Sequence, residues 1–406
     1  MEKLKEYLHN IEKPLKIAFV YADKPGELNT SIYRCVIPYL ALKNSGHHVS
    51  LLPVHLFEQN TPEANDALLK SDFIVVERNL FGDVLTRIAY WIVRGKIVIA
   101  NYDDYYEGIE ETNASYAFWN KGEVSLEQTE RVEEPFFYSY SDKYYKFKNT
   151  RIKEIKTHAK KIGYPHPIWQ FKMGLKMVYA QIMPSKYMMK KYKHLSPTYY
   201  MPNYFVTQNY IHMPKTERDF KIIGWGGSLS HLQSFKDSGV IQALENIINS
   251  RNDVKLLICG DQRLLPLIKI PDDKKLFQPY VKNEDWGRVV SSLFDIGIAP
   301  LEGEYDKYRS IIKPIEFMLT KTPFVASYGE AYKELFEIGG LGSFIKNSTE
   351  NWESKLSYIL DNYESEKEIM NGKPFQYALT WDYMNGVDYM VQTYRKIAKD
   401  LANRDL

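Results

Sequence analysis

Short apolar runs alternate with helix-length stretches along most of this chain. The runs Lys16–Ala22, Phe73–Val76 and Lys96–Ala100 are apolar in all or most positions, and the first ends in the turn-forming residues 23–26. Such runs are typical of strands buried on both faces, and helices between them predict parallel sheets with right-handed crossovers. The pattern therefore predicts an α/β fold of doubly wound, Rossmann-like sheets.

The 406 residues divide into two such series, as expected for two domains of ordinary size. Strands are predicted over 16–22, 48–54, 72–76, 96–100 and 176–184, and then over 221–225, 254–259, 294–299 and 324–327. Helices are predicted over 31–45, 83–94, 185–194, 237–250, 283–293 and 313–319, and from about 354 to 401. Residues 105–175 lack a clean period and suggest an irregular insertion, and 208–219 suggest a linker. We expect an N-terminal domain over 1–205 and a C-terminal domain over 206–375.

Several classes of protein are disfavoured by composition. Two cysteines, Cys35 and Cys259, supply neither a disulfide framework nor a cysteine-rich zinc site. No apolar run approaches the roughly 18 residues that span a bilayer, and the first 16 residues lack a signal-peptide core. A cytoplasmic protein is expected.

Positive charge is concentrated in one stretch of the chain. Lys143–His194 contains 14 Lys and Arg residues and a single acidic residue, Glu154, with nine aromatic residues interleaved. Cations neutralise phosphates and rings stack on bases, so this composition suits a nucleic acid. Anionic lipid headgroups would be attracted by the same charges. The alternative is a solvated lysine-rich face without a partner.

A glycine cluster follows the first predicted strand of the second series. Gly224-Trp-Gly-Gly-Ser228 lies between that strand and a helix, where backbone N–H groups and a helix N-terminus favour phosphate. Leu229 stands where a dinucleotide fingerprint needs its last glycine, and no Gly-Lys-Ser/Thr of a Walker A motif follows. His231 lies close enough in sequence to reach the reacting centre. A plain tight turn and a structural histidine are the alternatives.

The segment Tyr305–Phe317 combines two cations and a carboxylate. Arg309, Lys313 and Glu316 recur at spacings of four and three, so a helical turn places them on one face. Two cations suit a diphosphate, and a carboxylate suits a ribose diol. The segment follows a buried strand, at the carboxyl edge where open α/β sheets bind ligands. A surface ion-pair face is the alternative.

A pair of carboxylates, Asp103 and Asp104, follows the strand Lys96–Ala100 at another carboxyl edge. This pair is a candidate for orienting acceptor hydroxyls or for acting as a catalytic base. A pair without further ligands does not make a metal site, and none is predicted.

Taken in order, these motifs resemble the GT-B glycosyltransferases of the family 4 type. The first helix, with Ser31, Arg34 and Pro38 and the exit Gly46-His47, is similar to that family's, as is Asn101-Tyr-Asp-Asp104. Further similarities are Ser185 with Tyr187, Pro202-Asn203, the glycine loop with His231, and Ile298-Ala-Pro-Leu301 followed by Arg309, Ser310, Lys313, Glu316, Pro323 and Ala326-Ser327. The resemblance covers most of the chain outside about 105–175.

The resemblance implies two Rossmann-like domains facing across a cleft, with final helices (about 376–406) crossing back to the first. It implies a nucleotide-sugar, expected to be a UDP-sugar, as co-substrate, with no metal or other cofactor. Glu316 would take the ribose, and Arg309 and Lys313 the diphosphate. The loop Gly226, Gly227 and Ser228 would help to bind the diphosphate. The nucleobase of the donor would lie near residues 278–281, which include Tyr280. Many members carry a second glutamate eight positions before the first, where this chain has Tyr308.

The predicted activity is sugar transfer to an acceptor hydroxyl, with the acceptor bound by the N-terminal domain. One acceptor hypothesis is a hydroxylated base in nucleic acid, flipped out of any duplex; another is a membrane glycolipid or polysaccharide precursor, with the enzyme peripheral at the membrane. A nucleotide-sugar epimerase and a non-catalytic nucleic-acid-binding protein remain alternatives. A nicotinamide dehydrogenase is disfavoured because no complete dinucleotide fingerprint follows the first strand.

Overall fold

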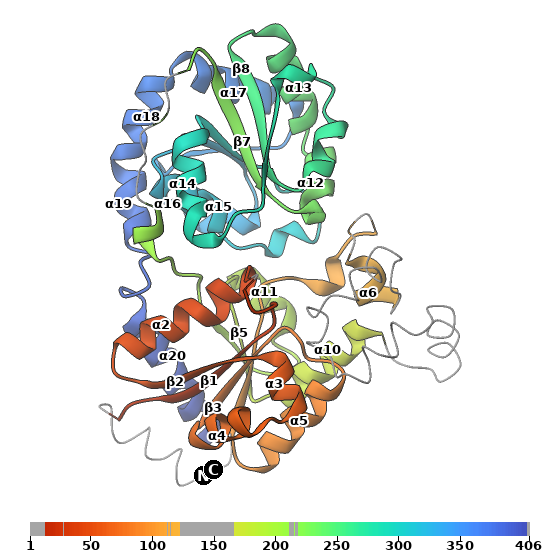
Figure 1. The fold of residues 1–406 in the computed structure, drawn as a ribbon, viewed down its shortest axis with the longest axis vertical. Helices are drawn as coiled ribbons and strands as arrows, with labels where there is room; N and C mark the ends of the chain where they lie inside the picture. The colour runs from red at the N-terminus through yellow and green to blue at the C-terminus, as the bar shows by residue number, and fades with distance from the viewer. Residues whose placement is uncertain are drawn as a thin grey trace. The chain divides into compact units, whose positions relative to one another are not determined.

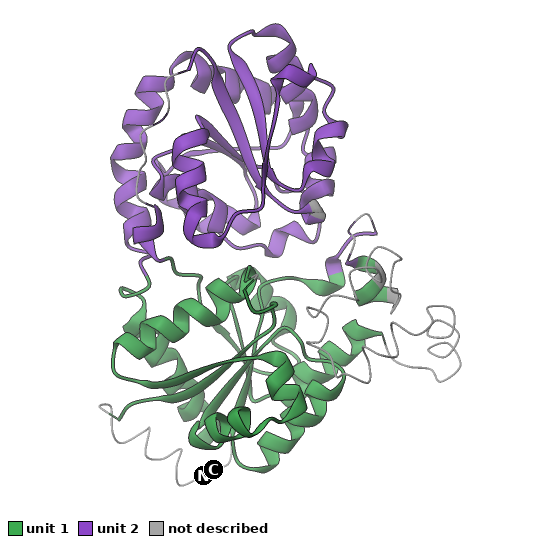
Figure 2. Cartoon of the chain, in the orientation of Figure 1, with its two compact units in different colours: residues 1–107, 116–205, 383–406 green, residues 108–115, 206–382 purple. Residues whose placement is uncertain are grey.

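The computed structural model describes residues 13–26, 28–111, 113, 115–121, 166–210, 215 and 218–403. The chain forms two compact units, coloured separately in Figure 2. Unit 1 comprises residues 1–107, 116–205 and 383–406, and unit 2 comprises 108–115 and 206–382. Each unit contains one six-stranded parallel sheet with helices around it (Figure 1).

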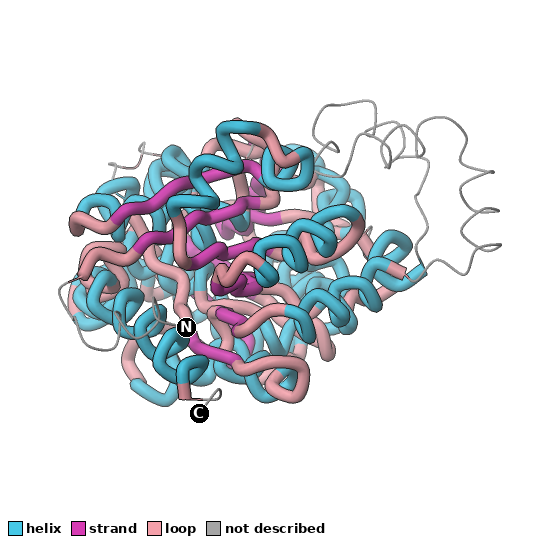
Figure 3. Tube along the Cα trace, turned by 90° about the horizontal axis from the view of Figure 1, so that it is seen from below, coloured by secondary structure: helices cyan, strands magenta, loops and turns pink. Residues whose placement is uncertain are grey.

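The sheet of unit 1 has the strand order β2-β1-β3-β4-β5-β6. Its strands are β1 (Lys16–Tyr21), β2 (His48–Pro53), β3 (Phe73–Glu77), β4 (Ile97–Asn101), β5 (Ala180–Met183) and β6 (Thr198–Tyr200). Its helices are the π-helical turn η1 (Ile32–Val36), α2 (Ile37–Asn44), α3 (Val54–Gln59), α4 (Pro62–Lys70), α5 (Asp83–Val93), α6 (Tyr116–Lys121), α10 (Pro167–Met177), α11 (Lys186–Tyr192) and α20 (Val387–Ala402). Every residue of β3 and β4 is buried, which explains why all residues but the last of each strand, Glu77 and Asn101, are apolar. Helices flank the strands on both sides in Figure 3.

The sheet of unit 2 has the order β12-β11-β10-β7-β8-β9. Its strands are β7 (Lys221–Gly227), β8 (Val254–Gly260), β9 (Lys275–Pro279), β10 (Ile296–Ala299), β11 (Phe324–Ser327) and β12 (Ser343–Ile345). Its helices are α12 (Leu232–Asp237), α13 (Val240–Ser250), α14 (Asn283–Leu293), α15 (Ile312–Leu319), α16 (Lys333–Ile338), α17 (Thr349–Asp361), α18 (Tyr363–Asn371) and α19 (Lys373–Leu379). The adjacent strands β7 and β10 lie where the winding direction reverses. Ligands of open α/β sheets bind at the carboxyl side of such a switch point.

One large apolar cluster stabilises unit 2 around β7 and β8. Trp225, Phe235, Leu244 and Trp352 are fully buried members of it, contributed by β7, α12, α13 and α17. Trp225 and Phe235 meet edge to face with ring centroids 5.0 Å apart. This rigid core ends immediately below the glycine loop that follows β7.

Four predicted features differ from the structure. The strand expected over 176–184 begins only at Ala180, because helix α10 continues to Met177. Most of this helix lies inside 105–175, where we expected an irregular insertion. The helix expected over 237–250 starts at Val240, since Gly239 takes a positive φ of 84° and separates it from α12. The linker expected over 208–219 includes a turn, Thr207–Tyr210, whose Tyr210 is buried. Strands β6, β9 and β12 were not predicted.

The helix predicted over 185–194 is present as α11, and Ser185 caps it, because its hydroxyl accepts a hydrogen bond from the backbone N–H of Met188 at 3.2 Å. Within the described residues, no helix is both long enough and apolar enough to cross a membrane.

Candidate functional site

The glycine loop ends β7 at the switch point of unit 2. A Cβ atom on Gly226 would lie 2.1 Å from the Trp286 ring, and one on Gly227 would lie 2.7 Å from the Trp225 ring. Only glycine fits such close approaches, so the tryptophans account for both residues. The glycines leave the loop without side chains of its own at these two positions, as in loops whose backbone N–H groups bind phosphate.

Two predicted site residues border this loop. The exposed Ser228 hydroxyl lies 2.8 Å from that of Ser230, just before the short turn η5 (Leu229–His231). Tyr280 follows β9, is 61% exposed, and donates its hydroxyl hydrogen bond to the Gly227 carbonyl at 3.2 Å. The contact joins the end of β9 to the end of β7, so Tyr280 presents an accessible ring face beside the glycine loop.

Lys313 lies in the first turn of α15, and its ammonium is 5.6 Å from the centroid of the Trp225 ring. It makes no hydrogen bond or ion pair with any described residue. The pKa of Lys313 is lowered to about 8, mainly by burial; Arg309 acts in the same direction, while Glu316 and Asp306 oppose the shift. A desolvated cation that forms no ion pair with a described residue, beside a glycine loop, is suited to binding an anion.

Arg309 supplies the second cation and is held in place from two sides. Its Nη2 donates to Ser230 Oγ at 3.1 Å, and its Nε lies 3.3 Å from Asp306 Oδ1. Its guanidinium also covers the Tyr305 ring, at 4.5 Å from the centroid. These contacts tie the segment after β10 to the loop after β7, on the two sides of the switch point.

Glu316 is 6% exposed and accepts a hydrogen bond from the Tyr210 hydroxyl at 3.1 Å. One carboxylate oxygen is thus positioned by a residue that the sequence analysis assigned to a linker. No local sequence pattern points to Tyr210, because the contact joins positions 106 residues apart.

His231 lies against the same loop. Its ring packs edge to face on Trp225 at a centroid distance of 5.7 Å, and its Nδ1 is buried with no hydrogen-bond partner among the described residues. Burial lowers the pKa of His231 well below its usual value, and Lys313 and Arg309 act in the same direction. The imidazole is therefore neutral at pH 7, with one polar atom left for a ligand.

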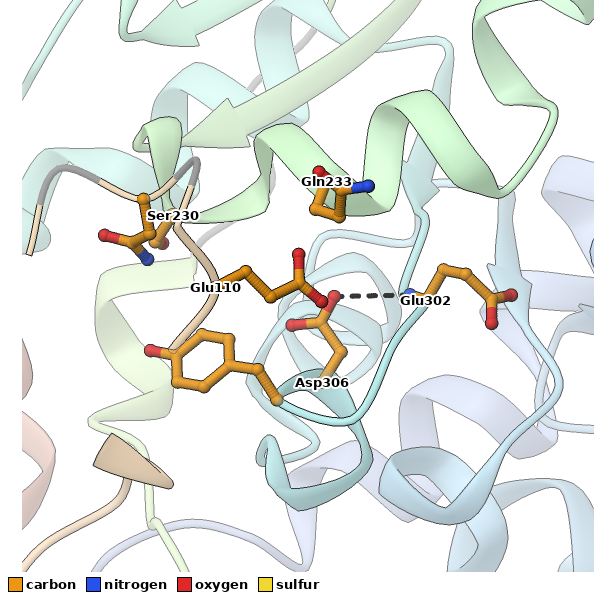
Figure 4. Close-up of a pocket in the computed structure, with 7 residues that line it drawn as sticks. Glu110, Ser230, Gln233, Glu302 and Asp306 are labelled. Atoms are coloured by element: carbon orange, nitrogen blue, oxygen red, sulfur yellow. Dashed lines mark hydrogen bonds between the residues drawn. The ribbon is translucent and has the colours of Figure 1, made fainter. Parts of the chain in front are cut away.

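Beside Arg309 lies a polar pocket that the sequence analysis missed. It is lined by Glu110, Asn113, Ser230, Gln233, Glu302, Tyr305 and Asp306. Glu110 comes from residues 108–115, far from the rest in sequence, and Figure 4 shows its carboxylate pointing toward that of Asp306 while the Glu302 side chain extends away. Burial raises the pKa of Glu110, and Asp306 and Asp237 add to the shift. Asp306 itself is held by hydrogen bonds from the Ser234 hydroxyl and the Glu302 amide.

The other two predicted residues, Asp103 and Asp104, lie in unit 1 beyond β4. The pKa of Asp103 is raised to about 8, mainly by burial; Asp104 acts in the same direction, and Arg78 and Arg34 oppose the shift. Asp103 Oδ1 is buried without a hydrogen-bond partner among the described residues. Nearby, Arg34 donates to Asn101 Oδ1 at 2.8 Å and Asn203 Oδ1 at 2.9 Å, which links η1, β4 and the segment after β6.

The structure therefore brings together Gly226, Gly227, Ser228, Tyr280, His231, Arg309, Lys313 and Glu316 within unit 2. It places Asp103 and Asp104 in the other unit. No group of three or more His, Cys, Asp or Glu residues arranged to hold a metal ion occurs in the described part of the chain.

No protein-family model and no curated protein sequence matches this chain. Solved structures do resemble it over nearly its full length. Sucrose-phosphate synthase from Thermosynechococcus elongatus superposes with a TM-score of 0.61 at 13% identity, covering 95% of this chain and 99% of that one. Anabaena HepE in complex with UDP and glucose gives 0.56 at 12% identity, with coverage of 94% and 99%.

A third similar structure is described as a UDP-N-acetylglucosamine 2-epimerase from Listeria monocytogenes. Its TM-score is 0.52 at 10% identity, and the match covers 96% of this chain and 98% of that one. At such identities the likeness concerns the fold. The two parallel α/β units of this chain therefore form a GT-B fold.

Proposed function

We propose that this protein is a glycosyltransferase that takes a UDP-sugar as donor and binds it in unit 2. The observation that carries the proposal is the buried ammonium of Lys313, which forms no ion pair or hydrogen bond with a described residue and lies beside a glycine loop at the switch point of the sheet. Arg309 adds a second, positioned cation. A diphosphate matches two cations and a ring of backbone amides. The complexes of HepE with UDP and with UDP-glucose support the choice of UDP.

In this proposal the charged residues and the glycine loop each have a defined task. Lys313 and Arg309 hold the diphosphate, and Glu316 accepts hydrogen bonds from the ribose hydroxyls. When the bond between sugar C1 and the phosphate oxygen breaks, negative charge grows on the departing UDP. The fixed cations and the loop amides stabilise that charge without reorganisation. The new bond joins C1 to the acceptor oxygen, whose proton leaves to a base or to the departing phosphate.

The pocket containing Glu110 is proposed to orient the sugar. It adjoins Arg309 through the shared residue Ser230, so a sugar linked to a diphosphate held at Arg309 can reach it. Its carboxylates and the Gln233 amide are suited to hydroxyl groups. Position 308, where the related glycosyltransferases often carry a carboxylate, holds a buried tyrosine that donates to Glu304 at 3.0 Å. Glu110 would supply the missing carboxylate from elsewhere in the chain.

The acceptor is proposed to bind unit 1, with Asp103 and Asp104 contacting its hydroxyls. The basic stretch 143–194 would attract a polyanionic acceptor, either a nucleic acid or a membrane glycolipid. Residues 143–165 of that stretch lie outside the described residues, so this part of the hypothesis rests on sequence.

The test is nucleotide release from a panel of UDP-, GDP- and ADP-sugars, with hydroxymethylated DNA, glycolipid or neither present. We expect release from a UDP-sugar, a matching mass gain on one acceptor, and loss of both in Lys313→Met. Conversion of the sugar to an epimer without any acceptor would replace the proposal with an epimerase. Failure of every nucleotide-sugar to bind, measured by calorimetry, would overturn the donor site itself.

A further inference from the structure

The histidine beside the glycine loop of unit 2 is buried without a hydrogen-bond partner. His231 is 8% exposed, its Nδ1 is a buried atom, and neither ring nitrogen makes a hydrogen bond with a described residue. The edge-to-face contact with Trp225 requires only a ring. Packing therefore does not explain a buried nitrogen that is left unpaired, which by itself destabilises the folded protein.

Two cations lie around the same tryptophan. The ammonium of Lys313 is 5.6 Å from the centroid of the Trp225 ring. Arg309 donates a hydrogen bond at 3.1 Å to the hydroxyl of Ser230, the residue before His231. Burial holds the pKa of His231 well below its usual value, and Lys313 and Arg309 are the charged groups that add to the shift. The imidazole thus lies in positive surroundings that a bound anion would reverse.

The carboxylates of the neighbouring elements already have partners. Asp306 is bound by Arg309 Nε at 3.3 Å and by the Ser234 hydroxyl of α12. Glu316, farther along α15 than the cation, accepts a hydrogen bond from a tyrosine hydroxyl at 3.1 Å. Neither carboxylate contributes to the pKa shift of His231. Within the part of the chain that the structure describes, a protonated imidazole would therefore have no counter-charge.

The proposed reaction changes the charge at this place. The diphosphate of a UDP-sugar carries two negative charges, and the protein offers two cations, one of which also binds Asp306. When the bond between sugar C1 and the phosphate oxygen breaks, the electron pair stays on that oxygen, and fully ionised UDP carries a third negative charge. The acceptor hydroxyl loses one proton as its oxygen bonds to C1. Uptake of one proton beside UDP therefore balances the step in both charge and atoms.

Resting on the proposed function, we propose that His231 is a catalytic residue that contacts the diphosphate and takes up one proton in the UDP complex. The imidazolium then matches the third negative charge of the leaving group. In the ligand-free protein the same ring is neutral, so it does not repel Lys313 and Arg309. A water molecule bound to the ring would also pair the nitrogen, but it would bring no change of protonation.

The first experiment is calorimetry of UDP binding to the full chain at pH 7, in two buffers of different ionisation enthalpy, which counts the protons taken up. We expect the wild type to take up roughly half a proton or more beyond the number for His231→Gln. The terminal phosphate of UDP and Lys313 also exchange protons, but they do so in both proteins, so the difference isolates His231. This variant should also bind UDP about tenfold more weakly. The control His55→Gln, at a half-buried histidine on α3 of unit 1, should change neither quantity.

Nuclear magnetic resonance of the wild type observes the ring directly. In protein labelled with carbon-13 histidine, the signal of His231 is identified among the nine histidines by its absence in His231→Gln. At pH 7, UDP should move this signal from the position of a neutral ring to that of an imidazolium. Uridine, which has no phosphate, should not move it in this way. Melting curves establish that each variant is folded.

The possible failures are distinguishable. Tight UDP binding with equal proton counts in the wild type and His231→Gln, or with a ring that stays neutral, would overturn this inference and leave the donor site intact. Weaker binding by the variant with an unchanged proton count would make His231 a neutral hydrogen-bonding group and would also overturn the proton uptake. Failure of UDP to bind the folded wild type would overturn the donor site and this inference together.

Discussion

The ammonium of Lys313 is buried, and burial of a charged group destabilises the folded protein. An ammonium placed among Trp225, His231 and Arg309 loses hydration and gains no ion pair from the described residues, so it opposes folding until an anion arrives. His231 is neutral in the same surroundings, so it adds no second repulsive charge. A bound diphosphate would supply the negative charge that Lys313 lacks, so the unfavourable desolvation of this ammonium favours binding of the anion.

The first prediction concerns that charge. Lys313→Met should weaken UDP-sugar binding by about 10- to 100-fold, the usual loss of a charge-assisted contact of roughly 1.5–3 kcal/mol. The melting temperature of the ligand-free protein should not fall, because the variant removes a poorly solvated cation. Calorimetry and melting curves check the two halves. Lys333→Met, at an exposed lysine paired with Glu337, serves as the control; a stability loss without an affinity loss would contradict the assignment.

The second prediction is the pH dependence of the same contact. With a pKa of about 8, Lys313 is mostly protonated at pH 7 and mostly neutral at pH 9. Only the protonated form attracts the diphosphate, so UDP affinity should fall as pH rises, by about tenfold between pH 7 and 9. The UDP affinity of Lys313→Met should change less with pH over the same range. An equally steep profile in that variant would assign the titration to another group.

The third prediction separates ribose from diphosphate recognition. Glu316→Gln should lower affinity for UDP by roughly tenfold, because a charged hydrogen-bond acceptor is lost, while competition by inorganic pyrophosphate stays unchanged. Tyr210→Phe removes the 3.1 Å hydrogen bond to this carboxylate and should have a smaller effect in the same direction. Equal losses for UDP and pyrophosphate would contradict a ribose contact for Glu316.

At the scale of elements, the glycine loop depends on large side chains from other parts of the fold. Trp286 on α14 and Trp225 on β7 occupy the space that side chains at 226 and 227 would need. The packing therefore requires glycine at both positions, and the pairing of β7 with β10 brings the N-terminal turn of α15 to the same edge of the sheet.

The fourth prediction tests this packing. Gly226→Ala would place a Cβ 2.1 Å from Trp286 Cη2, so α14 must shift. We expect a loss of about 1–3 kcal/mol in the free energy of unfolding, together with weaker UDP binding. Gly329→Ala, whose Cβ would meet nothing within 4 Å, should change stability by no more than about 0.5 kcal/mol. Similar effects at both positions would contradict the close approach.

The same elements show what sequence could predict. The buried strands β3, β4 and β11 were predictable because each is a short, mostly apolar run rich in β-branched residues or valine and followed by polar residues. Helix α10 was not predicted, because its polar side carries Trp169 and Met173 and hides the helical period. Tyr210 and Glu110 were missed because each reaches its partners through long-range contacts that leave no local pattern.

For the whole molecule, the candidate site residues fall in two separate units of one chain. The residues proposed to bind the donor lie in unit 2, and Asp103 and Asp104 lie in unit 1. The chain passes between the units near 205–206 and 382–383, where Thr207 donates to Asp382 at 2.6 Å and the Tyr383 amide donates to the Phe205 carbonyl at 2.9 Å. Residues 108–115 belong to unit 2, although unit 1 provides the sequence on both sides of them.

The fifth prediction uses this division. Hydrogen–deuterium exchange with and without saturating UDP should show protection at 226–231, 309–316 and, with a UDP-sugar, also at 108–111. Binding orders a loop only where contacts form, so amides of β1 to β4 in unit 1 should exchange at unchanged rates with UDP alone. Lys313→Met at the same UDP concentration provides the unprotected control. Protection by UDP that is confined to unit 1 would contradict the donor site. If Glu110→Gln loses only the extra protection that a UDP-sugar gives to residues 108–111, the sugar contact lies at that carboxylate.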